Sequence, residues 1–181
     1  MTTWAIDTTH TQIEFSVRHM GLATVRGRFN SFSGEVETDD AGEPTAIRVD
    51  IDAASIDTNN ADRDGHLRSA DFFDAEANPT ITFCSTSVTP RGGERYTVAG
   101  ELSMHGVTRS VELDAEIGGA ILDPFGLRRR GATAAGVINR KDFGLTWNQI
   151  LEAGALLVGE EVKLSLDVQV TTAAEPAAAT A

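Results

Sequence analysis

YTVAGELSMHGVTRSVELDAEI, residues Tyr96–Ile117, carries apolar side chains at alternate positions on both sides of His105 and Gly106. A period of two residues is typical of a strand with one buried and one exposed face. A short connection that contains glycine between two such strands is typical of a β-hairpin. The stretch therefore predicts two neighbouring antiparallel strands.

The same alternation recurs in the segments on either side. It is clear in IEFSV at 13–17, IRVDIDA at 47–53 and VKLSLDVQV at 162–170, and weaker in TITFCSTSV at 80–88 and ATAAGVIN at 132–139. Antiparallel strands with one solvated face give this pattern. We therefore predict an all-β protein. Long, bent strands favour a closed antiparallel β-barrel of about eight strands, because closure leaves no free sheet edge.

The segment VRGRFNSFSGEVET, residues 25–38, contains a break in phase. Its apolar residues up to Phe29 share one phase, and those from Phe32 onward share the other. A β-bulge within one strand produces such a slip of one residue. We therefore predict a bulge, with two strands joined by a tight connection as the alternative.

Residues 59–79 do not alternate, and we predict a short helical excursion there. Its acidic residues come early and Arg68 comes late, which suits the helix dipole. We expect Asp57, Thr58 or Asn59 to cap the helix.

The start of this excursion also imitates a calcium-binding loop. Counting from Asn60, oxygen-bearing side chains occupy positions one, three, five and twelve, and Gly65 occupies position six. An EF-hand needs a helix on both sides and a glutamate at position twelve. Here a predicted strand precedes the loop, position twelve is Asp71, and Arg63 and Arg68 add positive charge. We therefore predict a capped helix and no calcium site.

Composition and charge narrow the classes of function. The chain has 181 residues, with 15 basic and 27 acidic side chains and a net charge of -12. This charge argues against nucleic acid as a partner, because that affinity rests on neutralising phosphates, and against docking on an anionic membrane. Cys84 is the only cysteine, so no disulfide can form within the chain.

The predicted organisation is a single barrel domain over residues 1–171 and a disordered alanine-rich tail over residues 172–181. No apolar run reaches the ~18 residues that would span a bilayer. Asp7, Glu14 and Arg18 interrupt the amino-terminal segment, where a secretory signal needs an apolar stretch. We therefore expect a cytoplasmic protein with no stable membrane insertion.

The sequence contains no recognised motif for catalysis or for a cofactor. The histidines, His10, His19, His66 and His105, form no metal-binding pair at short spacing. No G-x-S-x-G elbow, G-x-G-x-x-G loop or phosphate-binding loop occurs. We expect no enzyme activity, no metal and no cofactor. An enzyme acting on a lipid-like substrate, with His66 or His105 as acid or base, is the alternative.

Phenylalanines on the inward phases can either fill the core or line a cavity. A barrel of about eight strands has an interior just wide enough for one ligand. A filled interior would instead make this a ligand-free stress or interaction protein. The run Arg128–Arg130 lies in a predicted loop, where it either meets an anionic head group or faces solvent.

Four segments resemble the YceI-like family of lipid-binding proteins. They are WAIDTTHTQIEFSVRHMGLATVRGRFNSFSGEV, NADRDGHLRSADFFDAEANPTITF, GELSMHGVTRSVELD and NRKDFGLTWN, which together span most of the chain from Trp4 to about Val170. The resemblance implies an extended antiparallel barrel similar to the lipocalins. It implies an interior that holds long apolar molecules, notably polyisoprenoids, in some members with a quinone or diphosphate end. It also implies a possible homodimer; many bacterial members are periplasmic, but this sequence shows no export signal.

The resemblance has departures in the loop DPFGLRRRGATAAG, residues 123–136. Arg129 matches the usual arginine of the family. Phe125, Leu127 and Ala132 stand where many relatives have tryptophan, asparagine and an aromatic residue. The family's helical excursion is matched by a further set, which we expect to cover one opening of the barrel with both phenylalanines turned inward. This set is His66, Leu67, Asp71, Phe72, Phe73 and Asp74.

We therefore predict that the protein binds a long-chain apolar ligand, a polyisoprenoid or an isoprenoid quinone, for transport, storage or sequestration. Arg129 and Arg140 are the predicted contacts to a head group. The predicted cavity wall consists of Phe15, Val17, Phe29, Phe32, Val49, Ile51, Phe72, Phe73, Phe83, Leu102, Leu113, Phe143 and Trp147.

Overall fold

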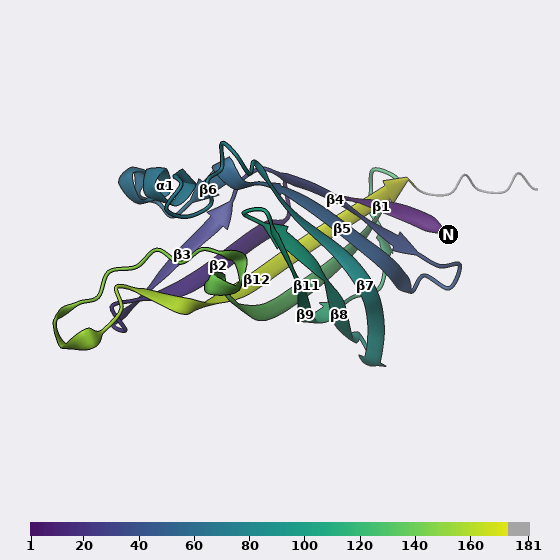
Figure 1. Cartoon of the computed structure of the whole chain (residues 1–181). Coiled ribbons are helices and arrows are strands. Elements are labelled where there is room, and N and C mark those ends of the chain that lie inside the picture. Colours follow the sequence, from purple (N-terminus) through teal and green to yellow (C-terminus); the bar gives the residue numbers. More distant parts are fainter. Residues whose placement is uncertain (174–181) are drawn as a thin grey trace, which may run out of the picture.

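The computed structural model describes residues 1–173, and most of them belong to β-strands (Figure 1). The strands are β1 (Thr2–Ile6), β2 (Gln12–His19), β3 (Ala23–Phe29), β4 (Phe32–Thr38), β5 (Pro44–Asp52), β6 (Ile56–Asp57), β7 (Thr80–Gly92), β8 (Arg95–Met104), β9 (Val107–Ile117), β10 (Ile121–Leu122), β11 (Leu127–Asn139) and β12 (Val158–Ala173). The described residues contain one α-helix, α1 (Ala61–Arg68), and the 3-10 helices η1 (Ala53–Ser55), η2 (Arg140–Phe143) and η3 (Glu152–Gly154). The all-β fold with a short helical excursion is confirmed.

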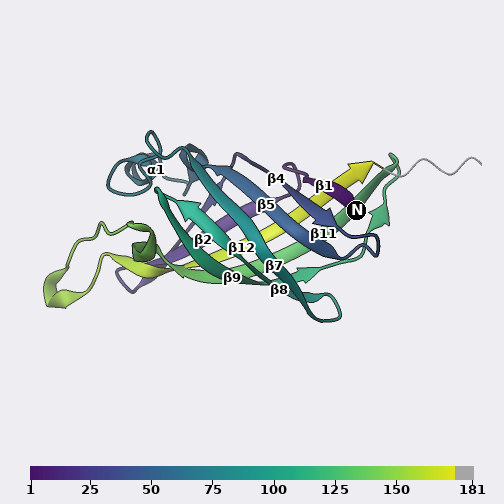
Figure 2. The ribbon, with the colours of Figure 1, turned by 45° about the vertical axis from the view of Figure 1, so that its right-hand side comes forward.

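Eight strands close into an antiparallel barrel, as predicted, and Figure 2 shows its long strands from a second side. The order around the barrel is β11, β9, β8, β7, β5, β4, β1 and β12, and β12 pairs back with β11. This closing pair is long, since its register runs from Leu127 opposite Ala173 to Asn139 opposite Glu161. Closure removes the free edges that an open sheet would expose.

The second edge of β12 is shared by β1 and β2, which follow one another in the same direction. β1 pairs with β12 at Val170 and Thr171, whereas β2 pairs with the stretch 158–167. Between them the amide of Asp7 donates to the carbonyl oxygen of Gln169. β4 pairs with β1, and β3 pairs with β2. The barrel is therefore longer than any one of these four strands.

The break in phase after Phe29 separates two strands, so the predicted bulge within one strand is wrong and the alternative of two strands holds. β3 and β4 still run in the same direction, because each is antiparallel to one of the two strands that follow one another along β12. The two residues between them bond to the turn around η1: the amide of Asn30 donates to Ser55, and Ser31 accepts from the amide of Asp52. The segment around η1 thus supplies hydrogen-bond partners to the two residues that interrupt the ladder.

The β8–β9 hairpin has the predicted two-residue connection. Met104 pairs with Val107, and the φ angles of His105 and Gly106 are 51° and 71°. Positive φ at both positions is what a type I′ turn requires, and this turn matches the twist of the flanking strands. Glycine at the second position adopts the conformation without a steric cost.

Helix α1 is capped one residue later than predicted. The side chain of Asn60 accepts from the amide of Arg63, at 2.9 Å. Asp64 is buried and accepts from both the amide and the hydroxyl of Thr58, at 2.8 and 2.5 Å. Oxygens that a calcium loop would direct at an ion are thus used within the chain. Residues 1–173 contain no group of three or more His, Cys, Asp or Glu side chains placed to hold a metal.

The carboxyl-terminal strand extends beyond residue 171, where the predicted domain ends. β12 continues through Thr172 and Ala173, which were predicted to begin the tail. The remainder of that predicted tail, residues 174–181, lies outside the described residues. In the part of the chain that the structure describes, no helix has the length and apolar character needed to cross a bilayer.

Candidate functional site

The barrel encloses two adjoining cavities. The wider has a volume of about 190 Å³ and the narrower a volume of about 110 Å³. Their surfaces are almost wholly apolar, because each strand of the wall turns the apolar half of its alternating pattern inward. The side chains of the barrel therefore do not fill its interior.

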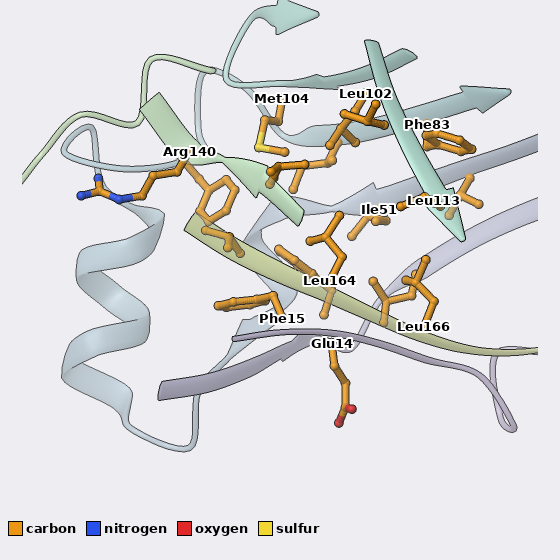
Figure 3. A pocket seen from close by; sticks show the side chains of 18 of the residues that line it. Glu14, Phe15, Ile51, Phe83, Leu102, Met104, Leu113, Arg140, Leu164 and Leu166 are labelled. Carbon is orange, nitrogen blue, oxygen red and sulfur yellow. The ribbon is translucent and has the colours of Figure 1, made fainter. Parts of the chain in front are cut away.

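Several strands around the barrel supply the wall of the wider cavity (Figure 3). Leucine, valine, isoleucine and phenylalanine side chains make up most of it, and Met104 adds a flexible thioether. The side chains labelled in Figure 3 that are apolar and line this cavity are Phe15, Ile51, Phe83, Leu102, Met104, Leu113, Leu164 and Leu166.

Three residues with polar side chains also border the wider cavity. The hydroxyl of Thr11 exchanges hydrogen bonds with the backbone of Gln169. The carboxylate of Glu14 points away from the cavity (Figure 3). The third is Arg140, whose guanidinium also points away from the apolar side chains in this view.

Arg140 is buried, and its hydrogen-bond partners among residues 1–173 are backbone oxygens. Its guanidinium donates to the carbonyl oxygens of Leu145, Trp147, Val158 and Gly159, at 2.6 to 3.3 Å. No carboxylate of residues 1–173 forms an ion pair with it. Burial lowers the pKa of the Arg140 guanidinium, and the charge of Glu160 acts in the opposite direction. The side chain therefore fastens the segment after η2 to the start of β12.

The excursion that contains α1 borders one end of the wider cavity. It contributes Leu67, Phe72 and Phe73 to the lining. The ring of Phe73 meets Phe29 edge-on, with centroids 5.9 Å apart. The ring of Phe72 packs on Trp147, with centroids 5.3 Å apart. Aromatic contacts thus hold the excursion both to the barrel wall and to the segment that Arg140 fastens.

The narrower cavity occupies the opposite part of the barrel. Trp4 borders it, is 2% exposed and donates from its indole nitrogen to the hydroxyl of Thr38, at 3.1 Å. Arg130 also borders it, and its guanidinium donates to the carbonyl oxygens of Gly42 and Gly118. Polar groups at this end are therefore satisfied within the chain.

The profile of the YceI-like domain matches residues 4–170. The chain belongs to the YceI-like family. A UPF0312 protein from Vibrio cholerae is 41% identical over 145 residues, which are 78% of this chain and 77% of the relative. A UPF0312 protein from Serratia proteamaculans is 45% identical over 139 residues, which are 76% of this chain and 71% of the relative.

Solved structures share the barrel of this YceI-like chain. BcnA from Burkholderia cenocepacia superposes with a TM-score of 0.78 at 22% identity, covering 91% of this chain and 98% of that one. The Campylobacter jejuni YCEI protein superposes with a TM-score of 0.70 at 29% identity, covering 88% and 90%. A Saccharophagus degradans domain described as polyisoprenoid-binding superposes with a TM-score of 0.68 at 18% identity, covering 95% and 98%.

Most of the residues predicted for the site lie around the wider cavity of this YceI-like barrel. Their contact with a ligand stays a proposal, because the cavity alone does not test it. They are Phe15, Val17, Phe29, Val49, Ile51, Phe72, Phe73, Phe83, Leu102, Leu113 and Arg140.

Three predicted wall residues lie outside both cavity linings. Phe143, the last residue of η2, is 2% exposed and packs in the core. Phe32 packs against the same core from β4. Trp147 covers Phe72 and also His66, whose ring centroid is 4.7 Å from that of the indole. Trp147 therefore contacts the excursion through His66 and Phe72 without lining a cavity.

Arg129 forms two ion pairs and lines neither cavity. Its guanidinium lies 2.8 Å from Asp7 and 2.6 Å from Asp123. The pKa of Asp7 is lowered to about 2, mainly by the hydrogen bond with His10 and further by that with Arg129, against the opposing effect of desolvation. Arg129 thus ties the β10–β11 turn to the connection between β1 and β2.

Sequence reasoning left out several lining residues. Most of them lie on the inward phase of strands that the alternation identified, so the signal was present. These are Ile13, Ile81, Met104, Val111, Ile138, Val162, Leu164, Leu166 and Val168. Leu145 and Val158 flank an irregular segment, where no period marks the inward side.

The histidines of the alternative enzyme hypothesis do not border the cavities. His66 bonds through Nε2 to Asp71, at 2.8 Å, and packs between Phe72 and Trp147. His105 lies in the β8–β9 turn, with Nδ1 3.1 Å from the carbonyl oxygen of Phe143. Each histidine has a structural role in these contacts.

Proposed function

We propose that this protein binds a long-chain apolar ligand, a polyisoprenoid or an isoprenoid quinone, inside the barrel and shields it from water. The observation that carries the proposal is an interior that is apolar and not filled by side chains. Burial of apolar surface contributes ~25 cal/mol per Å². Even a partly enclosed chain therefore offsets the cost of association.

The size of the cavities adds a condition to this proposal. At about 190 and 110 Å³, each is smaller than the ~300–1,000 Å³ of typical ligand pockets. A long chain would have to displace side chains as it enters the wider cavity, and a chain longer than this cavity would have to extend into the narrower one. Phe72 and Phe73 of the excursion around α1 line the wider cavity, so they are among the side chains that an entering ligand would displace.

The likeness to a domain described as polyisoprenoid-binding supports the proposed ligand class. The Saccharophagus degradans domain, described as polyisoprenoid-binding, shares the fold at 18% identity. His66 and His105 line neither cavity. This position favours a binding protein over an enzyme that uses either histidine as acid or base. A ligand-free protein with a filled core fits less well, because the interior contains open volume.

Two experiments test the proposal. The purified protein is extracted with organic solvent and the extract is analysed by mass spectrometry, which should reveal a prenyl chain. The delipidated protein is then titrated with a fluorescent polyprenol. Recovery of no apolar molecule, together with no binding in the titration, would refute the proposal.

A matched pair of variants locates the binding. Leu102→Asp places a carboxylate in the apolar cavity, where a charge is costly, and should reduce affinity at least tenfold. Val137→Asp makes the same kind of change at a 54% exposed side chain opposite Lys163 and should leave affinity unchanged. Equal affinity in two folded variants would place the ligand elsewhere. If Leu102→Asp does not fold, Leu102→Thr takes its place.

The transport role, the cytoplasmic compartment and the homodimer also belong to the proposal. A carrier should transfer a labelled polyprenol between two vesicle populations faster than spontaneous exchange does. Cell fractionation and light scattering of the purified protein test the compartment and the homodimer.

A further inference from the structure

The two cavities meet at one level of the barrel. Along β5, Ile51 borders the wider cavity, Ile47 borders the narrower one, and Val49 between them borders both. β9 and β12 show the same succession, with Leu113 and Leu166 bordering both cavities. The cavities are therefore stacked along the strands and separated at this level.

Phe83 is the largest side chain at the boundary. It lies on β7, is 8% exposed, and pairs with Val49 on one side and Leu102 on the other. The other residues that border both cavities are aliphatic: Ile6, Val49, Leu113, Leu166 and Val168.

A glycine in the neighbouring strand accommodates the ring of Phe83. A Cβ atom at Gly100 would lie 2.5 Å from Cζ of Phe83 and 2.6 Å from its Cε2, closer than side chains approach one another. Along β8, Gly100 stands between Leu102, which borders the wider cavity, and Val98, which borders the narrower one. The ring therefore lies against β8 at the level where one cavity ends and the other begins.

We infer that Phe83 sets the length of the apolar chain that the barrel accepts. This inference rests on the proposed function, because it assumes that a chain enters the wider cavity from the α1 end. With the ring in its observed position, the chain stops at Phe83. A longer chain reaches the narrower cavity only when the ring moves aside.

Strand geometry gives the expected size of the effect. From Val158 to Val168, the wider cavity follows ten residues of β12, or about 33 Å at ~3.3 Å per residue. Beyond Val168, the narrower cavity continues for two further residues of β12, to Val170, or about 7 Å. Removing the ring should therefore extend the accessible path by about a fifth.

The experiment compares chain-length profiles. Delipidated wild type, Phe83→Ala and Phe83→Leu are titrated with linear polyprenols of increasing isoprene number. The control is Phe32→Ala, which removes the same side chain from a partly buried position that packs against the core outside both cavities. Circular dichroism shows which variants are folded, and Phe83→Leu carries the test if the alanine variant is not.

In wild type and the control, affinity should rise with length and then level off or fall. In the Phe83 variants, the optimum should move to chains longer by about a fifth, and the longest chains should bind at least tenfold more tightly. An unchanged optimum in a folded Phe83 variant overturns the role of Phe83 and leaves the binding proposal standing. Absence of binding at every length, in wild type and variants alike, overturns both.

Discussion

Glycines inside the barrel wall are required by the rings that lie on them. Gly27 lies beneath Phe15 as Gly100 does beneath Phe83, with an added Cβ only 2.3 Å from Cζ of Phe15. We predict that Gly100→Ala lowers the free energy of unfolding by about 1–3 kcal/mol, because the methyl group overpacks the wall. Gly131→Ala is the control, since a Cβ at this exposed strand position meets nothing within 4 Å. Urea unfolding measures both, and equal midpoints would contradict the close packing.

Asp7, at the opposite end of the barrel from α1, makes the stability of the fold depend on pH. Its pKa is about 2 in the folded protein, against an ordinary value of 3.8, so the carboxylate stabilises the fold above that ordinary value. This stabilisation, about 2 kcal/mol, is lost as the pH falls from 3.8 toward 2. We predict that Asp7→Asn is less stable than wild type at neutral pH, and that the two converge in acid. Unfolding curves across this range test it, with Glu112→Gln on the exposed face as control.

At the scale of elements, the segment between η2 and β12 depends on one buried cation. Arg140→Met would leave four carbonyl oxygens without a donor, and we predict a loss of about 3–5 kcal/mol of stability. Lysine cannot replace the planar fork, so Arg140→Lys should recover only part of it. Hydrogen exchange should show the loss first in residues 145–159. Arg26→Met, at an exposed position of β3, should change neither measurement, and equal protection in both variants would argue against this role.

Strand faces were predictable from the sequence, but the paths of the strands were not. Alternation identified the inward side of β8, β9 and β12, because burial of one face imposes a period of two. It could not show that β1 and β2 share one edge of β12, because the alternation within one strand does not identify the strand that pairs with it. For the same reason the slip at Phe29 was interpreted as a bulge. Arg140 was predicted to contact a head group, whereas in the structure it donates to four carbonyl oxygens. A sequence does not show which carbonyl oxygens will surround a side chain.

For the whole molecule, a ligand held only by the interior should stabilise the complete barrel. Binding at 100 times Kd adds ~2.7 kcal/mol, and each kcal/mol raises Tm by about 2–4 °C in a chain of this size. We therefore predict a rise in Tm of roughly 5–10 °C with a saturating polyprenol. Leu102→Asp should show little shift, and Val137→Asp should show the full one.

Varying the salt concentration distinguishes apolar burial of the ligand from charge attraction as the source of that stabilisation. Arg129 is ion-paired with Asp7 and Asp123, and Arg140 is bonded to carbonyl oxygens, so neither is placed to attract an anionic head group strongly. Apolar burial does not depend on screening, whereas attraction between exposed charges weakens when the Debye length falls to ~3 Å at 1 M salt. The shift in Tm should therefore persist in high salt. A shift that disappeared there would show that the ligand binds through charge at the surface and not through the apolar interior.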